Sequence, residues 1–232
     1  MNVKLISHTP DPEKIIYAAA KTCYSKKIGS ELLEKPFDEK AKKLITNIVS
    51  RGHHSVIEHA AFTFSIEGIS RACSHQLVRH RVASFSQQSQ RYVNLAKLPH
   101  IVPPTIKKNE EAKRLFDAVI ETIKKTYQNL VELGIPKEDS RFVLPNATKT
   151  NIILTMNARS LWHFFELRCC LRAQWEIREL AWSMLEEVKR VAPTIFKNAG
   201  PWCIGGNCPE DDKACEIRVK EKMKKKSENN QM

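Results

Sequence analysis

Alternating apolar and polar residues mark the strands expected in this 232-residue chain, because side chains alternate between the two faces of a sheet. The alternation is clearest at 60–68, where Phe62, Phe64 and Ile66 are separated by polar residues. A shorter alternation predicts a strand at 1–7, and the segment TNIILTMN predicts another at 150–157. We therefore expect three short strands, far apart in the sequence.

A different period, with an apolar residue every three to four positions, predicts helices in much of the remaining chain. Gly52 is expected to stop one of these helices, and Gly134 with Pro136 to stop another. The Ser/Gln-rich stretch 83–92 has no clean period and is expected to be a loop with a short ordered core. The predicted helices cover 11–24, 38–51, 69–81, 110–133, 158–172 and 174–191. This order is neither all-helical nor a regular βαβ alternation, so the expected fold class is α+β.

One domain is expected over residues 1–200, followed by a Cys-containing, Lys-rich tail over 201–232. The last fifteen residues carry six basic and two acidic side chains, which is typical of a solvated segment. No apolar run reaches the roughly 18 residues that cross a bilayer, and the N-terminus lacks a signal-peptide pattern. We therefore expect a cytoplasmic protein without a membrane partner.

The formal net charge of +12 favours anionic ligands, either nucleic acid or small molecules that carry phosphates and carboxylates. The strongest basic cluster is RHRVASFSQQSQRY, residues 79–92. Arginine binds phosphate through two parallel N–H groups, and the interleaved Ser and Gln side chains add neutral hydrogen-bonding groups. The cluster is therefore either a phosphate-binding segment or a solvated basic loop.

A second chemical cluster is NARSLWHFFELRCCLRAQWEIREL, residues 157–180. On a helix, Arg159, His163 and Arg168 would lie near one face. An apolar stripe of Leu161, Phe164, Phe165 and Leu167 would hold that helix against the core. The segment is either a core helix with solvated arginines or a helix that presents Arg and His side chains to an anionic pocket.

Two further groups of residues raise the question of a metal. GHHSVIEHAAFTF at 52–64 contains three His and a Glu, but not in the H-E-x-x-H zinc arrangement. Near the C-terminus, Cys203, Cys208 and Cys215 have the spacing C-x₄-C-x₆-C, and Cys169 or Cys170 would add a fourth ligand if the tail folded back. Both spacings are unlike those of common zinc sites, so no metal is predicted.

Taken together, these motifs resemble the flavin-dependent thymidylate synthases over roughly residues 10–200. The resemblance rests on Arg79-His80-Arg81 followed after seven residues by Ser89-Gln90-Arg91-Tyr92. Gly52-His53 to Glu58-His59 upstream, and Asn157 to Leu161 with Leu167-Arg168 downstream, match in order and spacing. Gln87 departs from the family, several of whose members have Glu at this position.

The resemblance implies an α+β domain with a mixed sheet, assembled as a homotetramer whose active sites lie at subunit interfaces. It implies reductive methylation of dUMP to dTMP, with FAD as cofactor and with NADPH and 5,10-methylenetetrahydrofolate as co-substrates. The implied FAD contacts are Ser55, Arg79, His80, Arg81, Gln87, Asn157, Ala158, Arg159 and His163. The implied dUMP contacts are Gln76, Arg79, Gln87, Gln88, Ser89, Gln90, Arg91, Arg141 and Arg168. Arg168 is the implied catalytic residue, which helps to ionise uracil N3.

Two other functions would explain parts of the same sequence. A nucleic-acid-binding protein would use the basic surplus and the arginines of 79–91, although no known nucleic-acid module is present. A zinc enzyme would use the histidines of 53–59. We expect neither a stable nucleic-acid partner nor a metal. A salt titration of binding to random duplex tests the first alternative, and metal analysis of the purified protein tests the second.

Overall fold

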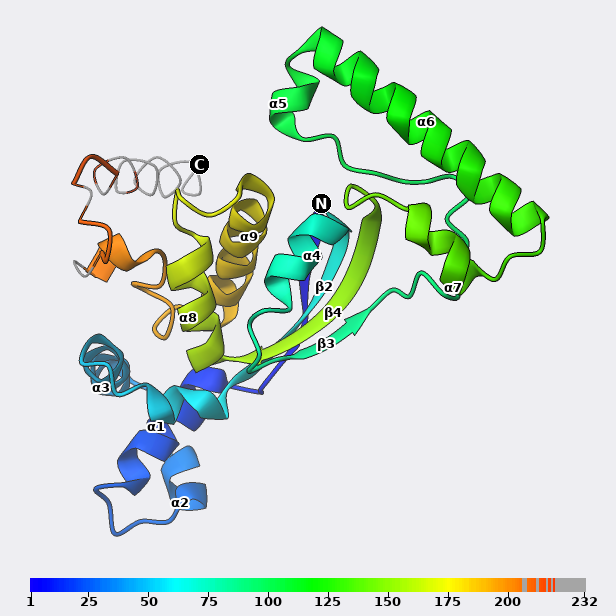
Figure 1. Cartoon of the computed structure of the whole chain (residues 1–232). Coiled ribbons are helices and arrows are strands. Elements are labelled where there is room, and N and C mark those ends of the chain that lie inside the picture. Colours follow the sequence, from blue (N-terminus) through cyan, green and yellow to red (C-terminus); the bar gives the residue numbers. More distant parts are fainter. Residues whose placement is uncertain (206–207, 212, 216, 218, 220–232) are drawn as a thin grey trace. The chain divides into compact units, whose positions relative to one another are not determined.

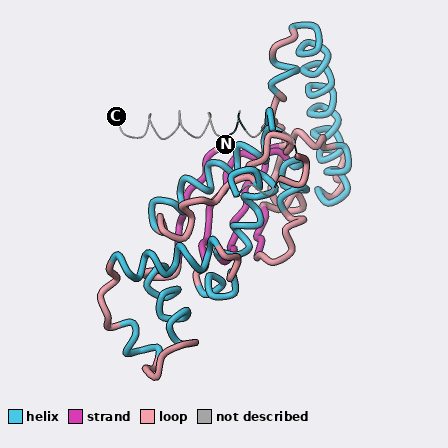
Figure 2. Tube along the Cα trace, turned by 90° about the vertical axis from the view of Figure 1, so that its left-hand side faces the viewer, coloured by secondary structure: helices cyan, strands magenta, loops and turns pink. Residues whose placement is uncertain are grey.

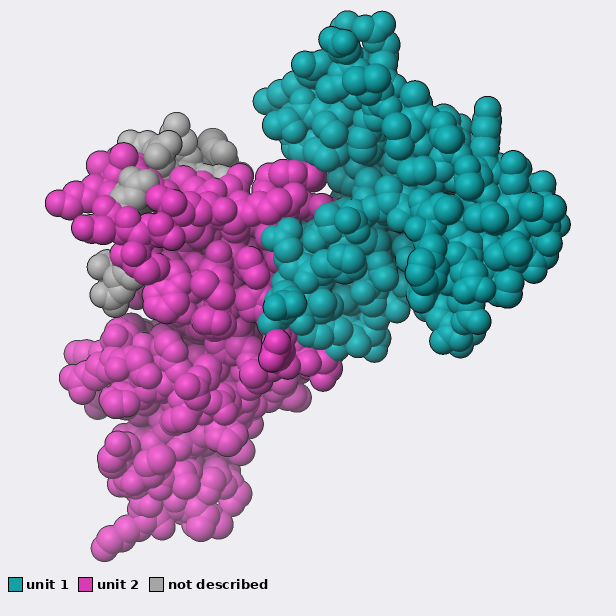
Figure 3. Space-filling model, viewed as in Figure 1, with its two compact units in different colours: residues 1–2, 66–79, 85–153 teal, residues 3–65, 80–84, 154–232 magenta. Residues whose placement is uncertain are grey.

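The computed structural model describes residues 1–205, 208–211, 213–215, 217 and 219. The chain divides into two compact units, each of which is built from separate stretches of sequence (Figure 3). Unit 1 comprises residues 1–2, 66–79 and 85–153, and unit 2 comprises residues 3–65, 80–84 and 154–232.

The strands form one four-stranded sheet in the order β1-β2-β4-β3 (Figures 1 and 2). β1 (Asn2–His8), β2 (Ala61–Ser70) and β4 (Lys149–Asn157) confirm the three predicted strands. β3 (Ser84–Gln87) lies in the stretch that was expected to be a loop with an ordered core. Its Ser/Gln sequence has little strand propensity, and pairing beside β4 makes it a strand.

The hydrogen bonds define antiparallel pairing of β2 with β4. Thr63 pairs with Thr155 through their hydroxyls at 3.0 Å, and the Gly68 amide donates to the Asn151 side chain at 2.9 Å. The central pair of the sheet is therefore antiparallel. The segment that connects β2 to β4 begins and ends at the same end of the sheet, since Arg71 N, directly after β2, donates to Thr148 O, directly before β4.

Unit 2 carries helices near both ends of its sequence. Its helices and 3-10 turns are α1 (Pro12–Thr22), α2 (Gly29–Leu33), α3 (Glu39–Ser50), η1 (His54–His59), α8 (Ala158–Arg168), α9 (Trp175–Val191) and η3 (Trp202–Gly205). α1 packs on α2, α3 and η1, and α8 packs on η1 and α9. α3 ends before Gly52, whose φ of 77° is the left-handed conformation that glycine adopts without strain, as predicted.

The core of unit 2 fixes α8, the helix of greatest chemical interest. Phe164 and Phe165 are fully buried, and the Phe165 ring lies 6.0 Å from that of Phe196. Leu161 is also buried, but Leu167 is 39% exposed, so the predicted apolar stripe is wrong at its last position. α8 ends at Arg168 rather than at 172, and its C-terminal residue therefore stands where the helix opens into a turn.

Unit 1 contains a long helix and several short ones. They are α4 (Arg71–Leu77), α5 (Pro104–Lys107), α6 (Glu110–Glu132), α7 (Lys137–Ser140) and η2 (Arg141–Val143). α6 confirms the helix predicted over 110–133, but its apolar side chains are not all buried. Ile120 and Tyr127 are buried, whereas Leu115 and Val119 are 66% and 57% exposed.

The expected tail falls largely outside the described residues, including its Lys-rich end. Within the described part, Val219 is only 2% exposed, which contradicts a fully solvated tail at that position. No helix among the described residues has the length and apolar character needed to span a membrane.

Candidate active site

The end of α8 brings Arg168 onto His80, which precedes β3 in the sequence. The Arg168 Nε–H donates to His80 Nε2 at 3.0 Å. Because Nε2 accepts this bond, the neutral His80 ring carries its proton on Nδ1. The His80 ring also lies 6.1 Å from that of His163 and 4.9 Å from that of Phe164. His80, from the cluster 79–92, therefore forms one group in unit 2 with His163 and Arg168, from the cluster 157–180.

Burial, together with the adjacent positive charges of Arg168 and His163, lowers the pKa of His80 from 6.5 to about 4. His80 is therefore neutral at pH 7 and keeps the lone pair that Arg168 uses. A protonated ring would lose this lone pair and would repel the guanidinium. A neutral acceptor thus holds the Arg168 side chain in place. His80 does not neutralise the positive charge of Arg168.

The start of α8 carries three more of the predicted residues. Asn157 caps the helix by accepting from Ser160 N at 2.9 Å, which orients the first turn. Arg159 is exposed and pairs with Glu58 of η1 at 2.5 Å. Ala158 is buried, and its amide is bonded to Ala60 O. Asn157 and Ala158 therefore fix the backbone from which the Arg159 side chain extends.

Unit 1 gathers a second cationic group, which we call the arginine cluster: Arg71, Arg91 and Arg141, with Glu138. Arg91 pairs with the Glu138 carboxylate at 2.6 Å, and Arg141 Nε donates to the Glu138 carbonyl at 3.0 Å. Burial lowers the pKa of Arg71, and the nearby positive charge of Arg141 adds to this shift. Two like charges held together in a half-buried place favour a bound anion.

The sequence motifs did not single out Arg71. It is the first residue of α4, and no short spacing connects it to Arg141, seventy positions later. Its place in the cluster follows from the antiparallel pairing that sets the end of β2 beside the start of β4, where Arg71 N donates to Thr148 O. This is a tertiary contact that local sequence patterns do not encode.

The predicted Ser and Gln residues lie along the segment that contains β3. Gln87 donates from its side chain to Ser74 Oγ at 2.9 Å and to Thr150 Oγ1 at 3.2 Å. Ser89 Oγ accepts from Arg91 N at 3.2 Å. These bonds order the segment that leads from β3 to the arginine cluster.

The remaining predicted residues are placed as follows. Most of the residues implied for dUMP are in unit 1: Gln76, Arg79, Gln87, Gln88, Ser89, Gln90, Arg91 and Arg141, with Arg168 in unit 2. Most of those implied for FAD are in unit 2: Ser55, His80, Arg81, Asn157, Ala158, Arg159 and His163, with Arg79 and Gln87 in unit 1. Arg79 and Arg81 follow the end of α4, which is shorter than predicted, and both are exposed.

The histidine and cysteine groups give no metal centre in the described part of the chain, where no three His, Cys, Asp or Glu residues are arranged to hold a metal ion. The seven cysteines form no disulfide. Burial raises the pKa of Cys203, and the nearby thiols of Cys208, Cys215 and Cys170 raise it further. The tail therefore approaches the turn after α8 at Cys170.

The comparisons with known proteins identify the family. The model of the thymidylate synthase complementing proteins matches residues 4–194, which is most of the chain. The chain belongs to the thymidylate synthase complementing protein family. Two similar members of this family are named flavin-dependent thymidylate synthases. That of Geobacter sulfurreducens is 54% identical over 93% of this chain and 94% of its own length. That of Clostridium tetani is 48% identical, with 93% of each chain covered.

A solved structure agrees with this assignment. Thymidylate synthase X from Helicobacter pylori, determined with FAD and dUMP, aligns with a TM-score of 0.68 at 25% identity and covers 86% of this chain and 98% of its own. The resemblance stated from the motifs is therefore confirmed, and so is the expected enzyme class. The match to the thymidylate synthase complementing protein family extends over residues 4–194 and does not depend on one motif.

Proposed function

We propose that this enzyme methylates dUMP to dTMP, with NADPH as reductant and 5,10-methylenetetrahydrofolate as carbon donor. It uses FAD, because its relatives are named flavin-dependent and the similar Helicobacter pylori structure was determined with FAD. The observation that carries the proposal is the Arg168 guanidinium held by His80 at the end of α8. This places a fixed cation, which cannot lose its proton, in a group of residues that match the family motif.

The donor set of unit 2 fits the flavin cofactor. Arg159 and Arg81 are exposed cations suited to a diphosphate, and His163 is an exposed ring on the same face of α8 as Arg159. Bound FAD supplies hydride chemistry that amino-acid side chains lack. The protein supplies the positions of these groups and the charge around them.

The arginine cluster of unit 1 fits the phosphate of dUMP. Arg71 and Arg141 already repel each other, so a dianionic phosphate relieves a cost that is present in the ligand-free chain. Arg91 would exchange its bond with Glu138 for the phosphate, or share the two. Ser89, two residues before Arg91, then directs its hydroxyl to the nucleotide as a binding group and not as a nucleophile.

Arg168 acts on the uracil ring. Attack of the pyrimidine ring on the one-carbon donor requires electron density in the ring, and ionisation of N3 supplies it. A cation beside N3 stabilises the resulting negative charge, and it does so most strongly where water is excluded. His80 accepts a hydrogen bond from Arg168 Nε, and this bond fixes the orientation of the guanidinium. The terminal N–H groups of Arg168 are thereby left to bind the uracil ring.

Replacement of His80 tests whether it positions Arg168. We expect His80→Ala to lower kcat for dTMP about 10-fold with a smaller change in the KM for dUMP, since the loss of one half-buried acceptor is worth about 1–3 kcal/mol. His80→Gln, which keeps an acceptor oxygen, should recover part of the rate. Flavin absorbance of each variant controls for loss of the cofactor, and equal rates for both variants would contradict a role through hydrogen bonding.

The same residue predicts a dependence of stability on pH. As pH falls below about 6.5, His80 of the unfolded chain takes up a proton, while the folded ring stays neutral until about pH 4. The contribution of His80 to stability is therefore full above 6.5 and decreases through this window. Denaturant unfolding at pH 7 and pH 5 should show a smaller decrease for His80→Gln than for the wild type, and equal decreases would argue against the lowered pKa.

We also propose the homotetramer that the family resemblance implies. The exposed apolar side chains Leu115 and Val119 of α6 would be covered in such an assembly. The interface would also allow residues of different subunits to meet in one active site. Light scattering on a sizing column measures the assembly directly, and a monomer at micromolar concentration would exclude it.

The experiment that tests the proposed function is dTMP formation with each component omitted in turn. Purified protein, FAD, dUMP, NADPH and 5,10-methylenetetrahydrofolate should together yield dTMP, detected by chromatography. Omission of any one of the three substrates should abolish the product. Product formation without the folate would identify a different carbon donor and contradict the proposal.

A further inference from the structure

Four cysteines of unit 2 approach one another, and the proposed reaction uses none of them. We call Cys170, Cys203, Cys208 and Cys215 the thiol cluster. Cys170 lies in the turn after α8, whereas the other three lie in the tail. Cys203 is buried, and the other three are half-buried. The cluster is therefore formed by a tertiary contact between the tail and this turn.

An ion pair holds the tail against the turn after α8. Arg172 Nη1 lies 3.2 Å from the Glu210 carboxylate. Two residues before Arg172 is Cys170, and two residues before Glu210 is Cys208. Asp211 N donates to Cys208 O at 3.3 Å, which closes the tail segment into a turn. The ion pair thus brings two segments that each carry a thiol to the same place.

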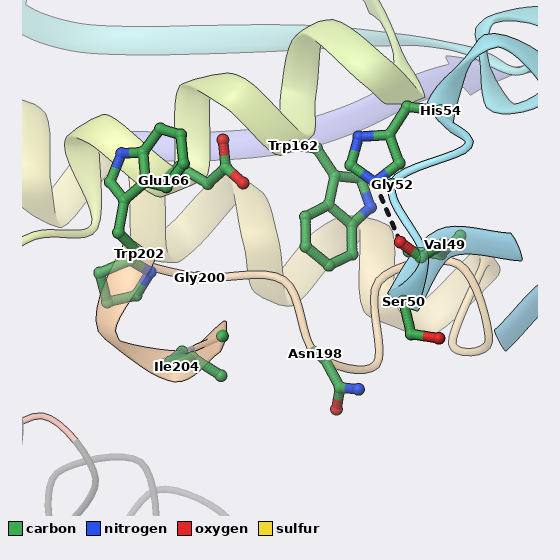
Figure 4. A pocket seen from close by; sticks show the side chains of 12 residues that line it. Val49, Ser50, Gly52, His54, Trp162, Glu166, Asn198, Gly200, Trp202 and Ile204 are labelled. Atoms are coloured by element: carbon green, nitrogen blue, oxygen red, sulfur yellow. Dashed lines mark hydrogen bonds between the residues drawn. The ribbon is translucent and has the colours of Figure 1, made fainter. Parts of the chain in front are cut away.

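Cys203 is placed by η3, which is tightly packed. Ile204 N donates to Pro201 O at 2.9 Å. Gly200 has a φ of 156°, and a Cβ at this position would clash with the Ile204 side chain, so the packing requires glycine. Trp202 and Ile204, on either side of Cys203, line a cavity of about 470 Å³ (Figure 4). The Cys203 side chain is itself only 5% exposed.

Cys203 is the member of the cluster that the other thiols surround. Burial raises the pKa of Cys203, and the thiols of Cys208, Cys215 and Cys170 raise it further, with Cys208 having the largest effect of the three. The effect of one thiolate on another falls with distance, so these sulfurs lie near Cys203. Burial disfavours the charged Cys203 thiolate, whereas a disulfide carries no charge and suits a buried place.

We propose that Cys203 and Cys208 are a redox-active pair that closes to a disulfide in the presence of a low-molecular-weight disulfide. Only four residues separate the two cysteines, so closure of the loop costs little chain entropy. Cys208 is the half-exposed member of the pair and is therefore the one that an external reagent reaches.

The oxidation takes place by two exchanges. The Cys208 thiolate attacks the small disulfide, whose S–S bond breaks as a mixed disulfide forms and one small thiol leaves. Cys203 then loses its proton and attacks the Cys208 sulfur, so the mixed S–S bond breaks and the second small thiol leaves. The protein pair gives up two electrons and two protons, and the small disulfide is reduced to two thiols.

The disulfide would join two parts of unit 2 that the structure already holds close to α8. Cys203 belongs to η3, whose Trp202 forms part of the cavity wall with Trp162 of α8 (Figure 4). Cys208 belongs to the segment that is bonded to Arg172 in the turn after α8. Oxidation of the pair therefore ties the cavity wall to this turn.

The test detects the disulfide directly and requires no substrate. The reduced, flavin-loaded full chain is equilibrated with glutathione buffers of increasing oxidised fraction, quenched with acid, alkylated and digested with trypsin. Cleavage after Lys197 and Lys213 leaves both cysteines of the pair in one peptide, residues 198–213. This peptide should lose the mass of two hydrogen atoms instead of gaining two alkyl groups. Half of it should be oxidised at a concentration of oxidised glutathione about 10-fold below that which modifies Cys23, because the second thiol is held nearby.

Two variants control the assignment. Cys208→Ser changes a half-exposed position, so the chain should still fold. In this variant Cys203 should be alkylated under conditions that oxidise the wild type. Cys23→Ser removes an exposed thiol outside the cluster, and it should oxidise as the wild type does.

Three other outcomes would overturn the proposal. Cys170 and Cys215 lie in other tryptic peptides, so a disulfide with either would appear as a cross-link and would identify a different pair. Glutathione on Cys203 and Cys208 separately would show that the two sulfurs do not meet. Thiols that resist oxidation and alkylation until a chelator is added would show that the cluster holds a metal ion. Because no dTMP need form, the proposal holds or fails independently of the proposed function.

Discussion

Arg168→Ala is expected to lower dTMP formation by about 100- to 1,000-fold while the protein remains folded and flavin-bound. This is the usual loss when one preorganised group that stabilises developing charge is removed. Arg168 is at the last turn of α8, where its Nε–H donates to His80 and its side chain is not part of the phenylalanine core. The folding of α8 therefore does not depend on the guanidinium.

Two further variants make the Arg168 prediction specific. Arg168→Lys retains a positive charge but loses the bond geometry of Nε, so it should recover only a small part of the rate. Arg190→Ala, on an exposed side chain of α9, is the matched control and should be fully active. If Arg168→Ala retained near-normal kcat with bound flavin, Arg168 would have no part in the chemistry.

Arg141→Ala is expected to raise the KM for dUMP about 10- to 100-fold with little change in kcat. The loss of one charge-assisted phosphate contact is worth roughly 1.5–3 kcal/mol, and such a contact acts on ground state and transition state alike. The variant also removes the positive charge beside Arg71, so it should fold at least as well as the wild type.

Deoxyuridine, which has no phosphate, provides the control for Arg141. The variant and the wild type should turn over or bind this nucleoside equally weakly, whereas they should differ on dUMP. Arg114→Ala, on the exposed face of α6 in the same unit, should leave both ligands unaffected. A loss on deoxyuridine as large as that on dUMP would show that Arg141 acts on something other than the phosphate.

The sequence predicted most of the secondary structure because its apolar periods are strong. The alternation around Phe62 and Phe64 and the long period of 110–133 correspond to β2 and α6. It did not predict β3, whose four residues have little strand propensity and are ordered by pairing with another strand. It also misplaced the ends of α4 and α8, where a turn and not a change of periodicity stops the helix.

For the candidate site, the residue types could be predicted and their partners could not. The motifs named Arg168, His80 and His163, but the bond that joins Arg168 to His80 links positions 88 residues apart. Arg71 carries no motif, and its significance lies in the positive charge of Arg141 nearby. Such contacts depend on how whole helices and strands pack, and the local sequence pattern does not predict that packing.

The central claim is that electrons pass from NADPH through bound FAD to dUMP. It is tested most directly by the visible absorption spectrum of the purified protein, recorded under anaerobic conditions before and after addition of NADPH in the presence of dUMP. The account predicts an oxidised-flavin spectrum that bleaches on addition of NADPH and returns when 5,10-methylenetetrahydrofolate is added, with dTMP formed in proportion. A colourless protein that FAD does not reconstitute, or a bound flavin that NADPH leaves oxidised, would contradict it.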